Sequence, residues 1–340
     1  MTEQSKPLLT DAGLHCGAFE LPESPLLSDE TRKALRRQAA EGKSASLETS
    51  SITPRVTPSE AEMLEAFYQG KVYQRLRHRY SVDITTETMN EVFVEIFTPV
   101  AGITDKNASR VLLNLHGGGF YAGSRSCSQL ESVPVAALGG IKVVSVDYRL
   151  YPKHKFPAAT DDAVAVYQAL LKDYAPENIG IFGTSAGATL SAQMMVRLQE
   201  IHLPLPKAVA MIAAGATALT GDSVAINQSI FGAQQPGFDL IESLKLGYYQ
   251  GANMQDPRVN PVLSEAYMAA FPPTFCASST RDFLLSSVVV THRKLRQAGV
   301  ETELHVWEGL DHFFHANVEL PETEELHCLM LSFFAKHFAE

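Results

Sequence analysis

The pentapeptide GTSAG at residues 183–187 lies between a short apolar run and a stretch of small residues with helical spacing. The apolar run, Ile179 to Phe182, predicts a buried strand, and Ala186 to Gln199 predicts a helix. A chain that passes from strand to helix through G-x-S-x-G makes a sharp turn, which strains the serine backbone and exposes its hydroxyl. The glycines at both ends leave room for the helix to pass close to the strand. This segment predicts a nucleophilic Ser185 at the end of a strand in a layered structure.

A second glycine motif, HGGG at residues 116–119, also follows an apolar run. Glycines at such a position can turn backbone N–H groups towards a bound carbonyl group, where they stabilise negative charge on its oxygen. We expect Gly118, Gly119 and Ala186 to form this oxyanion hole, Ala186 because its N–H directly follows the nucleophile. We expect the ring of His116 to hold the loop, and not to act as a base.

Short apolar runs alternate with helical patterns through most of the chain after residue 80. Strand signals begin at Tyr80, and the expected strands are Val92–Phe97, Val111–Leu115, Lys142–Tyr148, Ile179–Phe182, Ala208–Ala214, Thr274–Ser278 and Thr302–Trp307. The expected helices among them are Asp161–Lys172, Ala186–Gln199, Ser287–Gln297 and Glu322–Phe338. Buried apolar strands that alternate with helices predict an α/β fold, in which helices cover both faces of a mostly parallel central sheet.

Two segments do not follow this alternation. Residues 1–80 are polar and helical in pattern, and residues 215–261 form a long insertion between two expected strands. We expect these two segments to pack together as a helical cap over the nucleophile. Residues 81–340 would then form the catalytic domain that carries the insertion. The helices expected in the first segment are Ser28–Glu41 and one that opens at Pro58 and continues through Tyr68 towards Arg77.

A nucleophilic serine needs a base, and the base needs an acid that orients it. Where a G-x-S-x-G turn follows a parallel strand, the acid and then the histidine follow the serine on loops after later strands. Asp282 and His312 occupy these two positions, so we expect them to be the acid and the base. The rival residues lie in an expected strand or helix, beside the base, or before the serine: His305, His315, His327, His337, Asp147, Asp161, Asp162 and Asp311.

Composition and charge exclude several other classes of protein. The 340 residues carry a formal net charge of -10, so we expect no nucleic acid and no anionic membrane surface as a partner. No apolar run is long enough to span a bilayer, and the N-terminus lacks the apolar stretch of a signal peptide, which predicts a cytoplasmic protein. The four cysteines include no C-x-x-C pair, and the eleven histidines include no H-E-x-x-H pattern, so we expect no metal site.

Four motifs together resemble those of the hormone-sensitive-lipase-like esterases: HGGGF at 116–120, DYRLYP at 147–152, GTSAG at 183–187 and GLDH at 309–312. The resemblance covers about residues 75–340, and Thr184 is similar to the subfamily with GTSAG in place of the commoner GDSAG. It implies an α/β-hydrolase fold, hydrolysis of carboxylic esters with short acyl chains, no cofactor and, in this subfamily, often a homodimer. The family often has Asp-Pro-Leu at the acid, where this chain has Asp282, Phe283 and Leu284.

The sequence therefore predicts a serine carboxylesterase that hydrolyses a small-molecule ester through an acyl-enzyme. Phe120, Tyr121 and Thr184 flank the two glycine motifs, and we expect them to contact the substrate. The two bulky rings would crowd a long acyl chain. Two alternatives stay open: an amide hydrolase or deacetylase with the same triad, and a catalytically inactive ligand-binding protein of the same fold.

Overall fold

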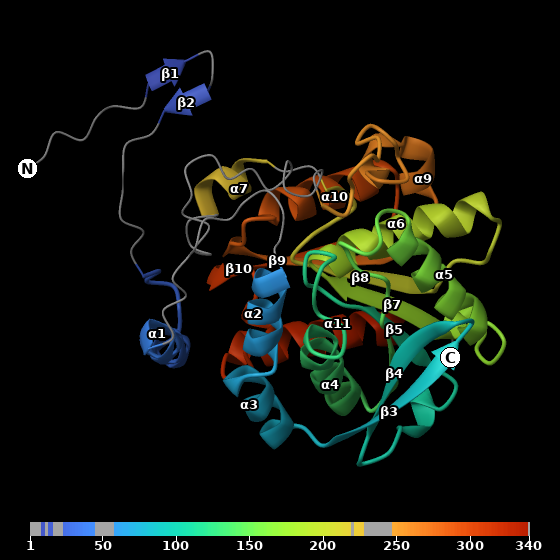
Figure 1. Ribbon diagram of the computed structural model, residues 1–340, viewed down its shortest axis with the longest axis horizontal. Coiled ribbons are helices and arrows are strands. Elements are labelled where there is room, and N and C mark those ends of the chain that lie inside the picture. Colours follow the sequence, from blue (N-terminus) through green and yellow to red (C-terminus); the bar gives the residue numbers. More distant parts are fainter. Residues whose placement is uncertain are drawn as a thin grey trace, which may run out of the picture.

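The computed structural model describes residues 8–10, 13–15, 23–44, 58–218, 221–227 and 247–338. Its middle layer is an eight-stranded sheet with the strand order β10-β9-β8-β7-β5-β6-β4-β3 (Figure 1). β4 pairs antiparallel with both β3 and β6, and all other neighbours in the sheet are parallel. The strands are β3 (Val82–Met89), β4 (Val92–Pro99), β5 (Val111–Leu115), β6 (Lys142–Val146), β7 (Ile179–Thr184), β8 (Ala208–Ile212), β9 (Thr274–Arg281) and β10 (Thr302–Asp311).

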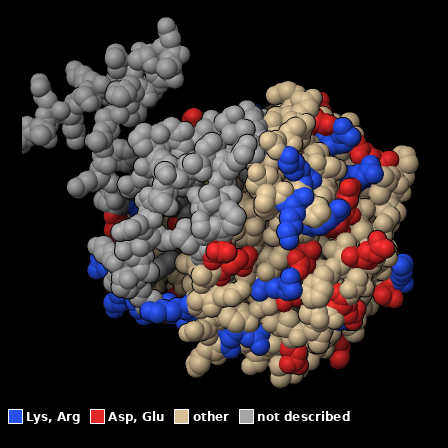
Figure 2. All heavy atoms as spheres, viewed as in Figure 1, with Lys and Arg blue, Asp and Glu red and all other residues tan. Residues whose placement is uncertain are grey.

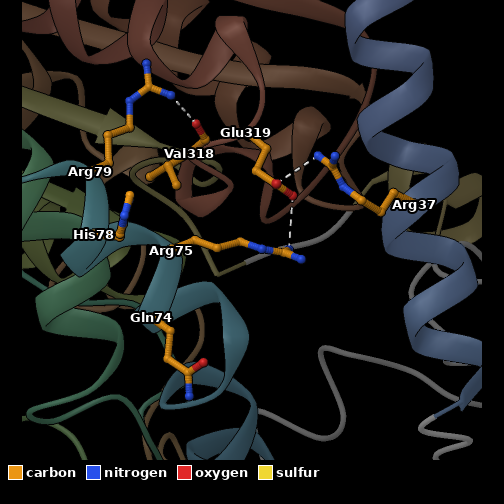
Figure 3. A pocket seen from close by; sticks show the side chains of 7 residues that line it. All are labelled: Arg37, Gln74, Arg75, His78, Arg79, Val318 and Glu319. Atoms are coloured by element: carbon orange, nitrogen blue, oxygen red, sulfur yellow. Dashed lines mark hydrogen bonds and ion pairs between the residues drawn. The ribbon is translucent and has the colours of Figure 1, made fainter.

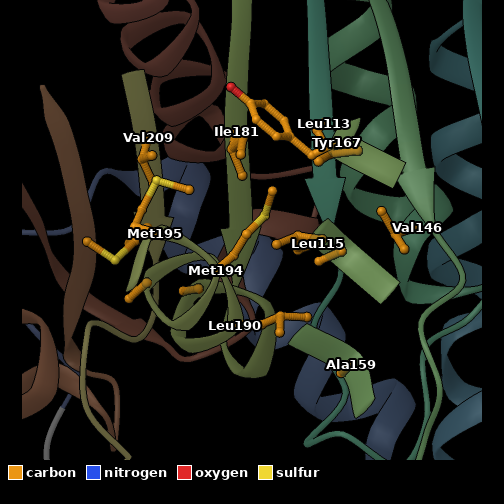
Figure 4. Close-up of a cluster of buried hydrophobic side chains, with 14 of the residues drawn as sticks. Leu113, Leu115, Val146, Ala159, Tyr167, Ile181, Leu190, Met194, Met195 and Val209 are labelled. Carbon is orange, nitrogen blue, oxygen red and sulfur yellow. The ribbon is translucent and has the colours of Figure 1, made fainter. Parts of the chain in front are cut away.

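Helices cover both faces of the sheet, and each face has its own hydrophobic cluster. One face carries α5 (Ala158–Leu170), α6 (Ala186–Glu200) and α10 (Leu285–Gln297). The other carries α3 (Lys71–Arg79), α4 (Cys127–Gly139) and α11 (Pro321–His337). Figure 4 shows part of the first cluster, in which Leu115 and Ile181 of the sheet lie near Met194 of α6. Strands buried on both faces need apolar side chains throughout, so the predicted α/β fold is confirmed.

The remaining elements are short or lie in the N-terminal segment. They are β1 (Leu8–Thr10), β2 (Gly13–His15), α1 (Asp29–Ser44), α2 (Pro58–Tyr68), α7 (Asp222–Asn227), α9 (Glu265–Ala269) and four 3-10 helices, η1 (Asp105–Asn107), η2 (Pro176–Asn178), η4 (Pro261–Leu263) and η5 (Phe314–Ala316). β1 and β2 form a separate two-stranded antiparallel sheet.

The expected strands are present. β4, β7, β9 and β10 extend further than the sequence suggested, whereas β6 and β8 end two residues earlier. β9 continues to Arg281 and β10 to Asp311, with a register shift between Trp307 and Asp311. The candidate acid and base therefore follow directly on the last residue of a strand. The helix α4 was not predicted, because Pro134 lies inside it and proline normally interrupts a helix.

The single helix expected from Pro58 towards Arg77 is wrong, because the structure divides it. α2 ends at Tyr68, and α3 begins at Lys71. Between them the amide of Gly70 donates to the carbonyl of Phe67 at 3.2 Å. Glycine lacks the side chain that stabilises a continuous helix, so the chain turns here at low cost.

The N-terminal helices are joined to the sheet domain near the start of α11. Arg37 of α1 and Arg75 of α3 both reach the carboxylate of Glu319, at 2.7 and 3.0 Å (Figure 3). The hydroxyl of Thr31 donates to Glu322 at 2.6 Å. The two arginines line a cavity of about 680 Å³, which no candidate catalytic residue lines. Exposed ion pairs contribute little to stability, so these contacts mainly orient α1.

Basic and acidic side chains are interspersed over the described part of the face in Figure 2. No helix among the described residues is long and apolar enough to cross a membrane. The same residues contain no cluster of three His, Cys, Asp or Glu side chains able to hold a metal ion. That nucleic acid is not a partner stays a prediction from the net charge of -10.

Candidate active site

Ser185 occupies the sharp turn between β7 and α6, with φ 50° and ψ -119°. A positive φ is strained for a serine, and the turn is held by its amide, which donates to the carbonyl of Ile212 at 2.8 Å. A Cβ atom on Gly187 would lie 1.8 Å from the carbonyl oxygen of Leu115. A Cβ atom on Gly183 would lie 2.3 Å from the carbonyl oxygen of Gly187. Only glycine at both positions lets α6 start this close to the sheet.

Ser185, His312 and Asp282 form one hydrogen-bonded chain. His312 Nε2 lies 2.9 Å from Ser185 Oγ, and His312 Nδ1 lies 2.7 Å from Asp282 Oδ1. A carboxylate can only accept, so Nδ1 carries the proton and Nε2 is free to accept from the serine hydroxyl. Asp282 is fully buried and also accepts from Ser278 Oγ at 2.7 Å and from the amide of Leu284 at 2.8 Å. These bonds fix the carboxylate that orients the base.

The rival residues have other partners. Asp311 accepts from the amide of Phe313 at 3.0 Å, and burial raises the pKa of its carboxyl. Asp147 pairs with Arg125 at 3.0 Å. His315 lies in η5 with a buried ring, and burial lowers its pKa to about 3. Asp311 and Asp147 therefore have other partners, and it is the ring of His312, not that of His315, that lies between Ser185 and Asp282.

The HGGG loop lies against the turn that carries Ser185, since a Cβ atom on Gly117 would lie 2.9 Å from Thr184 Oγ1. Gly118 and Gly119 have φ values of 114° and 64°, and a Cβ atom on Gly118 would lie 2.1 Å from the carbonyl oxygen of Ala122. Within the described part of the chain, the amides of Gly118, Gly119 and Ala186 donate no hydrogen bond. The Ala186 amide belongs to the first turn of α6, where N–H groups have no partner within the helix. Three N–H groups in the two glycine motifs are thus available as donors.

His116, the first residue of this loop, is anchored in the core. Its ring is fully buried and stacks on Tyr148 at a centroid distance of 4.2 Å. Tyr148 Oη donates to the carbonyl of His116 at 2.7 Å. Burial lowers the pKa of His116 to about 4, which keeps the ring neutral at neutral pH. The expected role in holding the loop fits this geometry.

The three residues expected to contact substrate have different surroundings. Phe120 is 2% exposed, and its ring stacks on Tyr248 at 4.2 Å within the core. Thr184 is also 2% exposed, and its hydroxyl donates to the buried Glu131. That these two side chains contact the substrate stays a prediction. Tyr121 is half-buried, and its ring borders Gly119, so it is the most exposed of the three side chains.

The N-terminal segment touches both loops that carry the candidate residues. Glu65 of α2 accepts from the amide of Gly123, at the end of the HGGG loop, at 2.6 Å. The rings of Phe67 and Tyr68 lie 5.7 and 5.5 Å from that of Phe313, which directly follows the candidate base. These two contacts join α2 to the loop of the oxyanion donors and to the loop of His312.

Part of the expected second cap segment also reaches the site. Asn227 of α7 donates from Nδ2 to the carbonyl of Asp282 at 3.2 Å. Phe231 and Phe238, which the sequence assigns to this segment, lie outside the described residues. Sequence reasoning missed Asn227, Glu65 and Glu131, because no motif marks them.

Comparisons with known proteins agree with this geometry. The sequence matches the alpha/beta hydrolase fold family over residues 112–316, a range that contains all three triad candidates. An esterase of Acinetobacter venetianus is 29% identical over 226 residues, which are 64% of this chain and 72% of the relative. The crystal structure of an esterase named E25 superimposes with a TM-score of 0.81 at 30% identity, covering 97% of this chain and 100% of that one.

A second solved structure, an esterase from the bacterial hormone-sensitive lipase family, has a TM-score of 0.75. It covers 92% of this chain and 99% of its own, and at 24% identity it adds evidence for the fold alone.

Proposed function

This chain belongs to the alpha/beta hydrolase fold family and is a carboxylic ester hydrolase, and we propose that it is a hormone-sensitive-lipase-like carboxylesterase. In this proposal Ser185, His312 and Asp282 cleave small esters of short carboxylic acids. The observation that carries this proposal is the hydrogen-bonded chain from Asp282 through His312 to Ser185. It ends beside three backbone N–H groups that donate to no atom of the described chain.

The reaction follows from these positions in two halves. Ser185 Oγ attacks the ester carbonyl carbon while His312 Nε2 takes the hydroxyl proton. The carbonyl oxygen becomes an oxyanion and accepts hydrogen bonds from Gly118, Gly119 and Ala186. His312 then returns the proton to the alcohol as it leaves, and an acyl-enzyme remains. Water, deprotonated by His312, attacks the acyl group and releases the acid.

Residues 1–80 and 215–261 act as a cap over this site in our proposal. The contacts of Glu65 with Gly123 and of Phe67 with Phe313 support a direct effect of the N-terminal segment on both loops. A closed site excludes water, which strengthens the hydrogen bonds to the oxyanion. Residues 81–340 supply the sheet and the triad.

A homodimer is the second structural part of the proposal. β10 is the outer strand at one edge of the described sheet. Val306 on this strand is 42% exposed, and Val289 and Val290 on the neighbouring α10 are 41% and 44% exposed. A sheet edge beside exposed apolar side chains is the kind of surface that a second copy can cover.

The cytoplasmic location predicted from the sequence stays a prediction.

A panel of p-nitrophenyl esters from acetate to palmitate tests the proposed chemistry. We expect the highest kcat/KM for the short esters, since the ring of Tyr121 borders the oxyanion loop. Ser185→Ala should lower kcat by about 10⁴-fold or more. Ser191→Ala is the matched control on α6. It also removes a buried serine hydroxyl, but one whose hydrogen bond stays within the helix, to the carbonyl of Gly187. Turnover that rises steadily towards palmitate, or full activity in Ser185→Ala, would contradict the proposal.

The same panel separates esters from amides. Acetanilides matched to the best esters should react at least about 10²-fold more slowly, because an amine is a poorer leaving group than an alcohol. Equal or faster amide cleavage would favour the amide hydrolase alternative.

A further inference from the structure

Glu131 of α4 lies beneath both glycine motifs and is 2% exposed. Its Oε1 accepts from the amide of Gly117 at 2.9 Å and from the hydroxyl of Thr184. The same oxygen accepts from Cys127 Sγ at 3.2 Å, and Oε2 accepts from Asn114 Nδ2 at 2.9 Å. All four partners are neutral donors.

A buried carboxyl group among neutral donors is costly unless every acceptor site is used. Burial raises the pKa of Glu131, and the four hydrogen bonds act against that shift. Asn114 is itself held, since its Oδ1 accepts from Ser145 Oγ at 2.7 Å. The network is therefore complete around Glu131, and a complete buried network fixes its members in one arrangement.

The two central partners each precede a residue of the active site. Gly117 comes directly before Gly118, the first oxyanion donor, and Thr184 comes directly before Ser185. A Cβ atom on Gly117 would lie 2.9 Å from Thr184 Oγ1, so the two segments are already as close as glycine allows. One carboxylate oxygen thus joins the oxyanion loop to the nucleophile turn.

We propose that Glu131 is a positioning residue, which holds the oxyanion loop and the nucleophile turn at their working separation through Gly117 and Thr184. This inference rests on the proposed esterase function. Oxyanion donors act at 2.7 to 3.1 Å from the position that the oxyanion occupies, and misplacement of about 1 Å can cost about 10²-fold in rate. The threonine of GTSAG then has a defined role, because its hydroxyl ties the turn to Glu131.

The test compares variants that remove or keep the hydroxyl. Thr184→Val removes it at nearly constant shape and should lower kcat about tenfold with KM changed less than about threefold. Thr184→Ser keeps the hydroxyl and should retain most of kcat. Glu131→Gln presents an NH₂ group to donors and should lower kcat about 10²-fold. Ser128→Ala is the control on the same helix, since its buried hydroxyl bonds to Glu95 and not to the site.

An alkylboronic acid gives a readout that a general loss of stability does not move. It forms a tetrahedral adduct with the serine, one oxygen of which occupies the oxyanion hole. Its inhibition constant should rise in Thr184→Val and Glu131→Gln by the factor that kcat falls, and stay constant in Ser128→Ala. If Glu131→Gln does not fold, the comparison of Thr184→Val with Thr184→Ser still tests the positioning role.

Two outcomes would overturn the inference, and they can be told apart. A wild-type protein that hydrolyses none of the esters overturns the proposed function and this inference with it. A wild-type enzyme that is active, with kcat and boronic acid affinity unchanged in Thr184→Val and Glu131→Gln, overturns the positioning role alone.

Discussion

Three buried histidines should make the folded protein sensitive to mild acid. His116, His315 and His327 are 0%, 2% and 3% exposed, and burial lowers their pKa to about 4, about 3 and about 4. In the unfolded chain each ring titrates near pH ~6.5. Between pH 6.5 and the folded pKa, the unfolded state therefore binds protons that the folded state does not. Stability is complete above pH ~6.5 and falls as the pH falls towards 4.

The magnitude follows from the size of these shifts. One proton bound only by the unfolded state costs about 1.4 kcal/mol per pH unit. From pH 6.5 to pH 5 each histidine thus lowers the free energy of unfolding by about 2 kcal/mol, and the three together by about 6 kcal/mol. That is a large part of the 5–15 kcal/mol typical of a folded domain. Glu131 and Asp311, whose pKa values burial raises, act in the opposite direction.

Because of these carboxyl groups, a single histidine variant is more informative than the total pH dependence. In His327→Leu the ring is replaced by a side chain of similar size. Nδ1 of His327 has no hydrogen-bond partner among the described residues, so the substitution leaves no partner of this atom unsatisfied. The free energy of unfolding is measured in urea at pH 7, 6 and 5. Between pH 7 and pH 5 it should fall by about 2 kcal/mol less in the variant than in the wild type. His78→Gln, on the exposed side of α3, is the control. A difference that stays constant with pH would refute the reasoning.

Three further predictions concern the site and its support. Asp282→Asn should lower kcat about 10⁴-fold, because an amide favours the wrong tautomer of the base, whereas Asp311→Asn should lower it less than about tenfold. The reverse order in ester kinetics would identify Asp311 as the acid. Gly187→Ala should yield no folded enzyme, since its methyl group would lie 1.8 Å from a β5 carbonyl oxygen. Gly102→Ala meets no atom within 4 Å at φ 89° and should cost only about 1 kcal/mol in urea unfolding, so similar losses in the two variants would contradict the steric argument. Removal of residues 1–45 should leave the circular dichroism of the sheet domain while kcat/KM falls at least about tenfold, and an unchanged kcat/KM would show that this arm is not part of the cap.

The sequence predicted those features that depend on local chemistry. The buried strands could be found because apolar runs bounded by polar turns have few other interpretations. Ser185, Asp282 and His312 could be proposed because each directly follows a strand of a parallel sheet. The positive φ of Ser185 was implied by the glycines around it.

Features that depend on side-chain direction or on distant partners could not be predicted. Phe120 has a φ of 67°, which turns its ring into the core against Tyr248, a residue far along the chain. The hydroxyl of Thr184 donates to the buried Glu131, and no local pattern in the sequence indicates this partner. The helix that carries Glu131 was itself hidden by Pro134.

The register of the sheet explains why residues so far apart in the chain form one site. Leu115, the last residue of β5, pairs with Gly183 near the end of β7, so the HGGG loop and the nucleophile turn leave the sheet side by side. At the edge of the sheet formed by β9 and β10, Asp311 of β10 pairs with Arg281 of β9. This pairing brings the next residues, Asp282 and His312, together in the same way. A shift of one residue in either pairing would turn the following side chain to the opposite face. The working distances of the site are therefore set by strand pairing, and the loops only complete them.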